Sequence, residues 1–441
     1  MERKIINELV AWKNRGNRKP LILNGARQVG KTYILKEFGA RHYSHFVHFN
    51  LETNASVRAY FEDDLIPERL IRMLEISAKS KIKPAETLII LDEIQASERA
   101  LLSLKVFCEE APGYHVVAAG SLLGVAMNRE KCSFPVGKVD ELSLFPMDFE
   151  EFLWALDMQS LAEEIKESFA TDTKMPVSLH KTALEIFQHY LIVGGMPEVV
   201  GNYVSTKSVM EVAEIQQKII NEYVADMAKY ADKTTSVKIR ACYNSVPNQL
   251  AKENKKFQYK IVQKGGTTTI FGEAIEWLNF AGIVLKCQKT EQGNVPIAVY
   301  SDLSDFKLYM GDVGILTMKS NTPYQIILNE TEDNTYLGSL TENYVAQCFA
   351  ANKIPLFYWK NDNSAEIDFV LQIGASSVPV EVKKGRNTRG KSLGIFVQKY
   401  KCPYAIRISR KNFGFENEIK SVPLYAVFCI EIKTNGLLSV V

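Results

Sequence analysis

Residues 25–32 read Gly-Ala-Arg-Gln-Val-Gly-Lys-Thr, which is a complete G-x-x-x-x-G-K-[ST] phosphate-binding loop. The apolar run 21–23 precedes this loop and the helically spaced segment 33–38 follows it, so the motif has the strand–loop–helix context that it requires. Glycines at both ends allow a backbone in which successive N–H groups point at phosphate oxygens. The motif predicts a nucleoside triphosphate site formed by Gly25, Ala26, Arg27, Gln28, Val29, Gly30, Lys31 and Thr32.

Two side chains of this loop have separate expected roles. Lys31 is expected to reach the β- and γ-phosphates of ATP, and the Thr32 hydroxyl is expected to hold Mg²⁺. The N-terminus of the following helix adds partial positive charge near the phosphates. The alternative is a lysine-bearing surface turn, which the strand–loop–helix setting disfavours.

A tandem pair of carboxylates follows a second apolar run. Asp92 and Glu93 come directly after residues 88–91, at the expected end of a strand. Asp92 can hold the Mg²⁺ water shell beside Thr32, and Glu93 can orient or deprotonate the attacking water. Taken alone, the pair is equally well explained as a solvated strand cap. Combined with the phosphate loop, it predicts an Mg²⁺-dependent ATPase in which Lys31 and Glu93 are catalytic.

Apolar strands alternate with helical stretches through residues 1–152, which predicts an α/β core with a parallel sheet covered on both faces. An extra strand at 46–51, between the phosphate loop and Asp92, resembles the additional-strand branch of P-loop ATPases, which includes the AAA+ proteins. That resemblance implies a polar sensor of the γ-phosphate at the end of the next strand, where Ser121 stands.

The C-terminal region holds a second group of polar residues with strand alternation. Asp368 lies between two apolar residues, and thirteen positions later Glu381 and Lys383 flank Val382. In a hairpin these three side chains would converge, so the two carboxylates could bind a divalent cation while the lysine positions water. Glu342, on the preceding helix, would add a further metal ligand.

These four residues lie in the order helix, strand, strand, strand, helix, strand. The expected elements are 337–351, 356–359, 366–372, 378–383, 391–400 and 404–408. This arrangement resembles the PD-(D/E)XK nuclease superfamily, with Glu342, Asp368, Glu381 and Lys383 as the matching residues. The resemblance implies metal-dependent cleavage of nucleic acid, and the alternative is a binding module that does not cleave.

The region 206–330 has a winged-helix outline. We expect helices at 236–245, 249–254 and 271–281, then a hairpin that pairs 283–287 with 297–300. Five lysines surround Phe257 and Tyr259, which would suit a nucleic-acid backbone but is also ordinary for an exposed helix and turn. A cationic segment at 383–391 allows the same two interpretations.

Four segments look like the signatures of a prokaryotic AAA-type ATPase family whose members carry a C-terminal domain of unknown function. They are 116–124, 133–140, 144–152 and 191–199, and the resemblance extends over nearly the whole chain. It implies an ATP-binding protein without indicating its physiological role. Lys138 stands where many relatives look to have an arginine, which argues against an arginine finger at that position, and Arg129 and Lys138 are the two candidates that remain.

The chain has 441 residues, which is too many for one core. We expect an ATPase core at 1–152, a helical lid or linker at 153–205, a winged-helix-like region at 206–330 and a nuclease-like α/β domain at 331–441. The apolar fraction of 46% and the lack of an apolar run near ~20 residues indicate a soluble protein, and the net charge of +2 argues neither for nor against a nucleic-acid partner.

Seven dispersed cysteines without a C-x-x-C pair favour reduced thiols and a cytoplasmic location. The six histidines show no ligand spacing and are interpreted as structural. The expected ligands are ATP and Mg²⁺, the candidate partners are nucleic acid and another protein, and an oligomer stays open. Two functions follow: an ATPase that controls a nuclease-like domain, or a nucleotide-controlled switch that binds a partner without cleavage.

Overall fold

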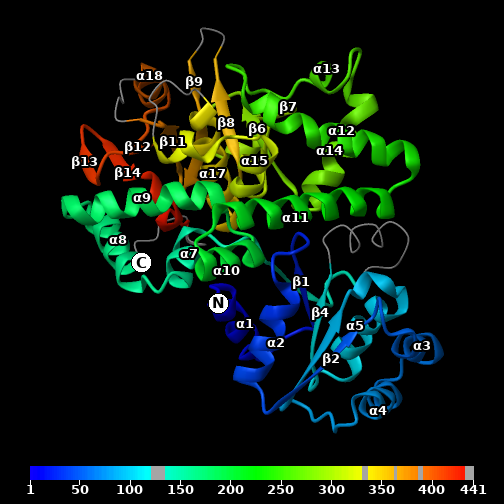
Figure 1. Ribbon diagram of the computed structural model, residues 1–441. Coiled ribbons are helices and arrows are strands. Elements are labelled where there is room, and N and C mark those ends of the chain that lie inside the picture. Colours follow the sequence, from blue (N-terminus) through cyan, green and yellow to red (C-terminus); the bar gives the residue numbers. More distant parts are fainter. Residues whose placement is uncertain (121–134, 330–335, 362–364, 386–390, 433–441) are drawn as a thin grey trace. The chain divides into compact units, whose positions relative to one another are not determined.

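The computed structural model describes residues 1–120, 135–329, 336–361, 365–385 and 391–432 (Figure 1). The chain divides into an N-terminal unit, Glu2–Phe145 with Phe280–Gly282, and a C-terminal unit formed by Pro146–Asn279 and the residues from Ile283 onward. Ser121 and Arg129 lie outside the described residues. Within the described parts of the chain, no helix is both long and apolar enough to cross a membrane.

The N-terminal unit is built on a five-stranded parallel sheet with the order β2-β3-β4-β1-β5. Its strands are β1 Leu21–Asn24, β2 His45–Asn50, β3 Thr87–Asp92, β4 His115–Ala119 and β5 Asp140–Ser143. Every residue of β3 and β4 is buried, as expected for strands that are covered on both faces. The predicted parallel α/β core is therefore confirmed.

Helices lie on both sides of this sheet, with α1 and α2 on one side and α3 and α5 on the other (Figure 1). Their bounds are α1 Ile5–Lys13, α2 Lys31–His42, α3 Ala55–Asp63, α4 Pro67–Ala78 and α5 Glu98–Glu110, with a short 3₁₀ helix η1 at Ile94–Ala96. One core cluster joins Phe49 and Leu91 of the sheet to Phe61, Leu74 and Phe107 of the helices. Burial of this apolar face holds the strands in place.

The C-terminal unit begins with helices. Their bounds are α7 Phe149–Ala155, α8 Gln159–Thr171, α9 Val177–Val193, α10 Pro197–Thr206, α11 Val209–Tyr230, α12 Lys233–Leu250, α13 Tyr259–Val262, α14 Thr268–Phe280, α15 Val313–Lys319, α16 Tyr324–Leu328, α17 Tyr336–Ala351 and α18 Lys391–Tyr400, with 3₁₀ helices η2 Ile297–Tyr300 and η3 Leu424–Cys429. Helices α8, α9 and α10 occupy most of the segment 153–205, which was expected to be helical.

Two sheets complete this unit. The first has the order β7-β6-β8-β9 and contains β6 Val284–Thr290, β7 Ser301–Met310, β8 Phe357–Lys360 and β9 Glu366–Ile367. The second has the order β10-β11-β12-β14-β13 and contains β10 Phe369–Ile373, β11 Ser376–Val382, β12 Ala405–Ser409, β13 Gly414–Glu416 and β14 Ile419–Pro423. Because β6 pairs with β8, the first sheet joins strands from both sides of the boundary expected near residue 330.

Two details of the winged-helix expectation are wrong. The separate helix at 249–254 does not form, because α12 continues to Leu250. One face of α12 is buried up to that end, through Ile239, Tyr243, Val246 and Leu250. The hairpin partner of β6 is not 297–300, which forms the 3₁₀ helix η2. The partner is β7, whose longer ladder pairs seven residues with β6.

The Gly-Gly-Met-Pro segment that follows α9 is a tightly packed junction. The Gly195 N–H donates to Asp312 Oδ2 at 2.6 Å, and the Gly195 carbonyl accepts from the Met147 N–H at 2.7 Å. A Cβ on Gly194 would lie 2.2 Å from Asp312 Oδ1, and one on Gly195 would lie 2.0 Å from the Met147 carbonyl oxygen. Only glycine fits these positions, because the neighbouring groups are held by their own hydrogen bonds.

Replacing Gly195 with alanine should therefore destabilise the protein. The new Cβ would overlap a backbone oxygen, and overpacking of this kind costs about 1–3 kcal/mol or more. We expect a clear fall in the thermal unfolding midpoint of Gly195→Ala. The matched control is Gly394→Ala in α18, where nothing lies within 4 Å of the added Cβ and helix propensity favours alanine. Equal midpoints for Gly195→Ala and the wild type would contradict this account of the junction.

Candidate functional site

The phosphate-binding loop connects β1 to α2 with the backbone conformation that the motif predicts. Gly30 immediately precedes α2 with a φ of 91°, and Gln28 also has a positive φ of 68°. A Cβ on Gly25 would lie 2.4 Å from the Leu144 carbonyl oxygen, so a side chain is excluded there. A left-handed conformation at a non-glycine residue is costly and is concentrated at ligand-binding segments.

The Lys31 side chain lies across this loop. Its Nζ donates to the carbonyl oxygens of Gly25 and Ala26, both at 2.9 Å. The ammonium group is therefore close to the loop backbone whose N–H groups are expected to face phosphate. This position is consistent with the predicted contact between Lys31 and the phosphates of a nucleotide.

Thr32 and Asp92 meet at the carboxyl edge of the sheet. The Thr32 Oγ1, in the first turn of α2, donates to Oδ2 of Asp92, the last residue of β3, at 2.8 Å. Burial opposes ionisation of Asp92, but hydrogen bonds from His48 and Thr32 outweigh it and hold the pKa of this carboxyl below its ordinary value. An ionised carboxylate beside a hydroxyl is a set of hard oxygen ligands that fits Mg²⁺.

His48, one of the histidines expected to be structural, also contacts this site. Its Nε2 lies 3.1 Å from Asp92 Oδ2. Parallel pairing of β2 with β3 aligns His48 with Ile90 and Asn50 with Asp92. Ligand spacing along the sequence could not reveal this contact, because it depends on which strand lies beside β3. A polar residue near the end of a neighbouring strand was the only available signal.

Glu93 directly follows the strand that carries Asp92. Its backbone is left-handed, with a φ of 53°, and its N–H donates to Asp92 Oδ1 at 3.1 Å. The Gln95 side-chain amide donates to Glu93 Oε2. The sequence analysis did not single out Gln95. Lys138, one of the two arginine-finger candidates, pairs instead with Glu109 at 2.8 Å.

The predicted hairpin in the C-terminal unit forms between β10 and β11. Asp368 Oδ2 accepts the Val382 N–H at 2.8 Å. Glu381 is buried and is flanked by two cations, with Lys383 Nζ at 3.1 Å and Arg407 Nε at 3.3 Å. Arg407 was not predicted, and it reaches Glu381 because β12 pairs in register with β11.

Glu342 is likewise engaged by cations, in what we call the Lys307 cluster: Lys255, Lys307, Tyr309, Glu342 and Glu366. Lys307 is 1% exposed and lies 3.1 Å from Glu342 and 2.7 Å from Glu366. Lys255 and the Tyr309 hydroxyl also bond to Glu342. Burial opposes ionisation of the Glu342 carboxyl. The positive charges of Lys255 and Lys307 stabilise its ionised form and lower its pKa to about 2.

The metal group predicted for Glu342, Asp368 and Glu381 does not form. In the described parts of the chain, no three His, Cys, Asp or Glu side chains are arranged to hold a metal ion. Ammonium and guanidinium groups occupy the carboxylates that were expected to bind the cation. Burial and the nearby charge of Glu342 raise the pKa of Asp368 to about 6, so this carboxyl is still mostly ionised at neutral pH.

Three of the aromatic and basic residues at 252–264 make contacts inside the C-terminal unit. Phe257 is buried and stacks on Phe306, with ring centroids 5.5 Å apart. Lys256 pairs with Asp305 at 2.7 Å, and Lys255 belongs to the Lys307 cluster. These contacts favour the packing interpretation of these three residues over a nucleic-acid surface.

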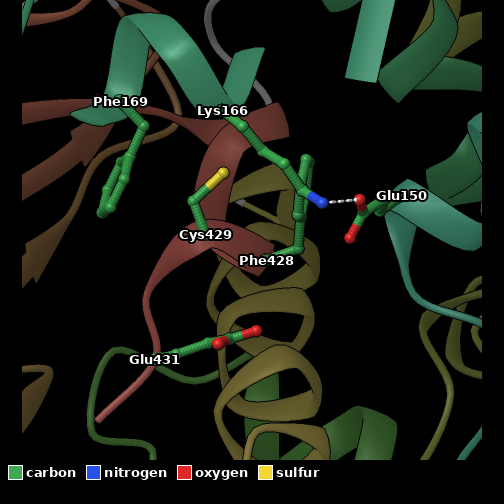
Figure 2. A pocket seen from close by; sticks show the side chains of 6 residues that line it. All are labelled: Glu150, Lys166, Phe169, Phe428, Cys429 and Glu431. Atoms are coloured by element: carbon green, nitrogen blue, oxygen red, sulfur yellow. Dashed lines mark ion pairs between the residues drawn. The ribbon is translucent and has the colours of Figure 1, made fainter. Parts of the chain in front are cut away.

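A small cavity lies elsewhere in the C-terminal unit. Figure 2 shows the Lys166 ammonium directed at Glu150, with which it forms an ion pair. The lining residues are Glu150, Lys166, Phe169, Phe428, Cys429 and Glu431. The cavity volume of about 50 Å³ is far below the ~300 Å³ or more of ordinary small-molecule sites, so it is not a nucleotide pocket.

Comparison with protein families identifies the N-terminal part of the chain. Residues 17–153 match the model of the AAA domain (AAA_14). The chain contains an AAA-type P-loop ATPase domain. Residues 184–325 and 337–427 match two models that are each described as a domain of unknown function, DUF8612 and DUF4143. No curated protein matches the chain significantly.

Solved structures show only distant likeness to the chain. The Walker-type ATPase PABY2304 of Pyrococcus abyssi is 12% identical with a TM-score of 0.43, and the match covers 72% of this chain and 95% of that one. The Aeropyrum pernix ORC1 protein in complex with DNA is 14% identical with a TM-score of 0.30, and the match covers 73% of this chain and 91% of that one. AMPPCP-bound DnaA from Aquifex aeolicus is 14% identical with a TM-score of 0.28, and the match covers 63% of this chain and 86% of that one. The AAA family match, and not these scores, assigns the domain.

The Lys307 cluster leads to a stability prediction. Replacing Lys307 with methionine would remove a buried cation from the buried Glu342 and from Glu366, whose side chain is 24% exposed, and breaking a buried ion pair costs about 3–5 kcal/mol. Lys307→Met should therefore unfold at a clearly lower denaturant concentration than the wild type. Lys360 also pairs with Glu366 but is 36% exposed, so Lys360→Met is the matched control, with an expected loss of about 0–1 kcal/mol. Similar midpoints for the two variants would show that burial does not set the importance of these lysines.

Proposed function

We propose that this chain binds ATP with Mg²⁺ and hydrolyses it, and that the C-terminal unit is a binding module controlled by the nucleotide. The observation that carries the nucleotide site is the hydrogen bond between Thr32 and Asp92, beside a loop across which Lys31 lies. Three elements required for triphosphate binding thus meet at one edge of the sheet: a backbone cradle, a cation and a pair of oxygen ligands.

The roles of the site residues follow from their chemistry. The N–H groups of residues 25–32 would bind phosphate oxygens, while Lys31 exchanges loop carbonyls for the β- and γ-phosphates. Thr32 and Asp92 would hold Mg²⁺, which neutralises charge on the phosphates when it is bound. The Glu93 carboxylate would orient the attacking water and accept its proton.

For the C-terminal unit, the cations at Glu342 and Glu381 favour binding over cleavage. Metal-dependent hydrolysis needs carboxylates that are open to a divalent cation. Here Lys307 and Lys255 engage Glu342, and Arg407 and Lys383 engage Glu381. A domain can keep this order of helices and strands without cleaving nucleic acid. We therefore retain the hypothesis of a nucleotide-controlled switch that binds a partner without cleavage.

The hydrolysis proposal is tested by Glu93→Gln. This change keeps the size of the side chain but removes the base, and general-base catalysis contributes about 10²–10⁴-fold to rate. We expect ATP affinity within twofold of the wild type and a turnover lower by about 100-fold or more. Glu98→Gln, at an exposed position five residues further on, should turn over ATP normally. Full turnover in Glu93→Gln would exclude Glu93 as the base.

The switch proposal is tested with labelled single- and double-stranded DNA in Mg²⁺ or Mn²⁺. We expect no cleavage by the wild-type protein, because the candidate carboxylates already carry cationic partners. DNA mobility shifts with and without ATP would then separate a nucleic-acid partner from a protein partner. Cleavage that disappears in both Asp368→Ala and Lys383→Ala would instead establish the nuclease function and contradict our proposal.

A further inference from the structure

Glu93, the proposed base, is held by a neighbouring side chain. The Gln95 Nε2 donates a hydrogen bond to Glu93 Oε2. Both side chains are partly buried, so water competes less for this bond than it would at a fully exposed position. The bond engages one carboxylate oxygen, and a carboxylate has a second oxygen with its own acceptor sites.

The backbone between these two residues is fixed at both ends. Glu93 is left-handed, and its carbonyl accepts the Ala96 N–H at 2.9 Å across the 3₁₀ helix η1. Ile94 is fully buried beneath this turn. The turn then leads into α5, whose first turn is capped by the Ser97 Oγ, which accepts the Ala100 N–H at 3.1 Å. A short, anchored turn of this kind gives Gln95 a defined position relative to Glu93.

We propose that Gln95 is a positioning residue for ATP hydrolysis, which deepens and rests on the function proposed above. Its amide holds Glu93 Oε2 and leaves Oε1 to accept the proton of the attacking water. A glutamate has three rotatable side-chain bonds, so an unrestrained carboxylate would spend much of its time away from the γ-phosphate. Holding a reacting group in place contributes to rate because a misplacement of about 1 Å can cost on the order of 100-fold.

The left-handed backbone of Glu93 supports this assignment. Non-glycine residues adopt this conformation at a cost, and such outliers cluster where the surrounding structure enforces a functional geometry. The conformation directs the chain so that Gln95, two residues later, can reach back to the Glu93 carboxylate.

The test uses the full-length chain with ATP and Mg²⁺. In Gln95→Ala we expect kcat to fall by about 10–100-fold, while KM and the ATP dissociation constant stay within twofold of the wild type. Gln95→Glu keeps the size of the side chain but replaces the hydrogen-bond donor with a second carboxylate, so its kcat should be no higher than that of Gln95→Ala. Gln159→Ala, at an exposed site in the other unit, is the matched control and should be normal.

A double variant separates positioning from general damage. If Gln95 acts through Glu93, the pair Glu93→Gln with Gln95→Ala should turn over no more slowly than Glu93→Gln alone, since coupled residues are not additive. A further loss in the double variant, an unchanged kcat in Gln95→Ala, or an increased kcat would each overturn the assignment. An inactive wild-type protein that binds no ATP would instead refute the proposed function itself.

Discussion

The hydrogen bond between Thr32 and Asp92 is the interaction on which the nucleotide site depends. The strands β1 and β3 do not pair, because β4 lies between them. The hydrogen bond joins the start of α2, which follows the loop after β1, to the end of β3 at the carboxyl edge of the parallel sheet, where α/β folds bind ligands. The glycine conformations position the loop that leads to Thr32, and the buried core around β3 positions the strand end that carries Asp92.

The two units use carboxylates and cations in opposite ways. In the N-terminal unit, Asp92 receives hydrogen bonds from a hydroxyl and an imidazole, and we propose that it holds Mg²⁺ together with Thr32. In the C-terminal unit, Glu342 already faces the Lys307 ammonium and Glu381 faces Arg407. These cations are side chains of the protein itself, so they neutralise the two carboxylates without a bound metal ion. Under the function proposed above, the same residue types serve catalysis in one unit and stability in the other.

The sequence predicted what depends on neighbouring residues. The phosphate loop, the strand that ends at Asp92 and the β10–β11 hairpin are all encoded by local spacing, and they form. Contacts that depend on strand order were not predicted. His48 reaches Asp92 only because β2 lies beside β3, and Lys307 reaches Glu342 from β7, which pairs with β6 in place of the expected segment 297–300. Chain periodicity carries no information about such lateral neighbours.

Direct measurement of ATP affinity tests the central claim most clearly. Calorimetric titration with ATP and Mg²⁺ should show one binding site in the wild-type chain and the same affinity in Lys105→Ala, which changes an exposed lysine of α5. Lys31→Ala removes the ammonium group that lies across the loop, and its affinity should fall on the order of 100-fold, as expected for a lost charged hydrogen-bond partner. Equal affinity in Lys31→Ala and the wild type would contradict the assignment of this loop as the nucleotide site.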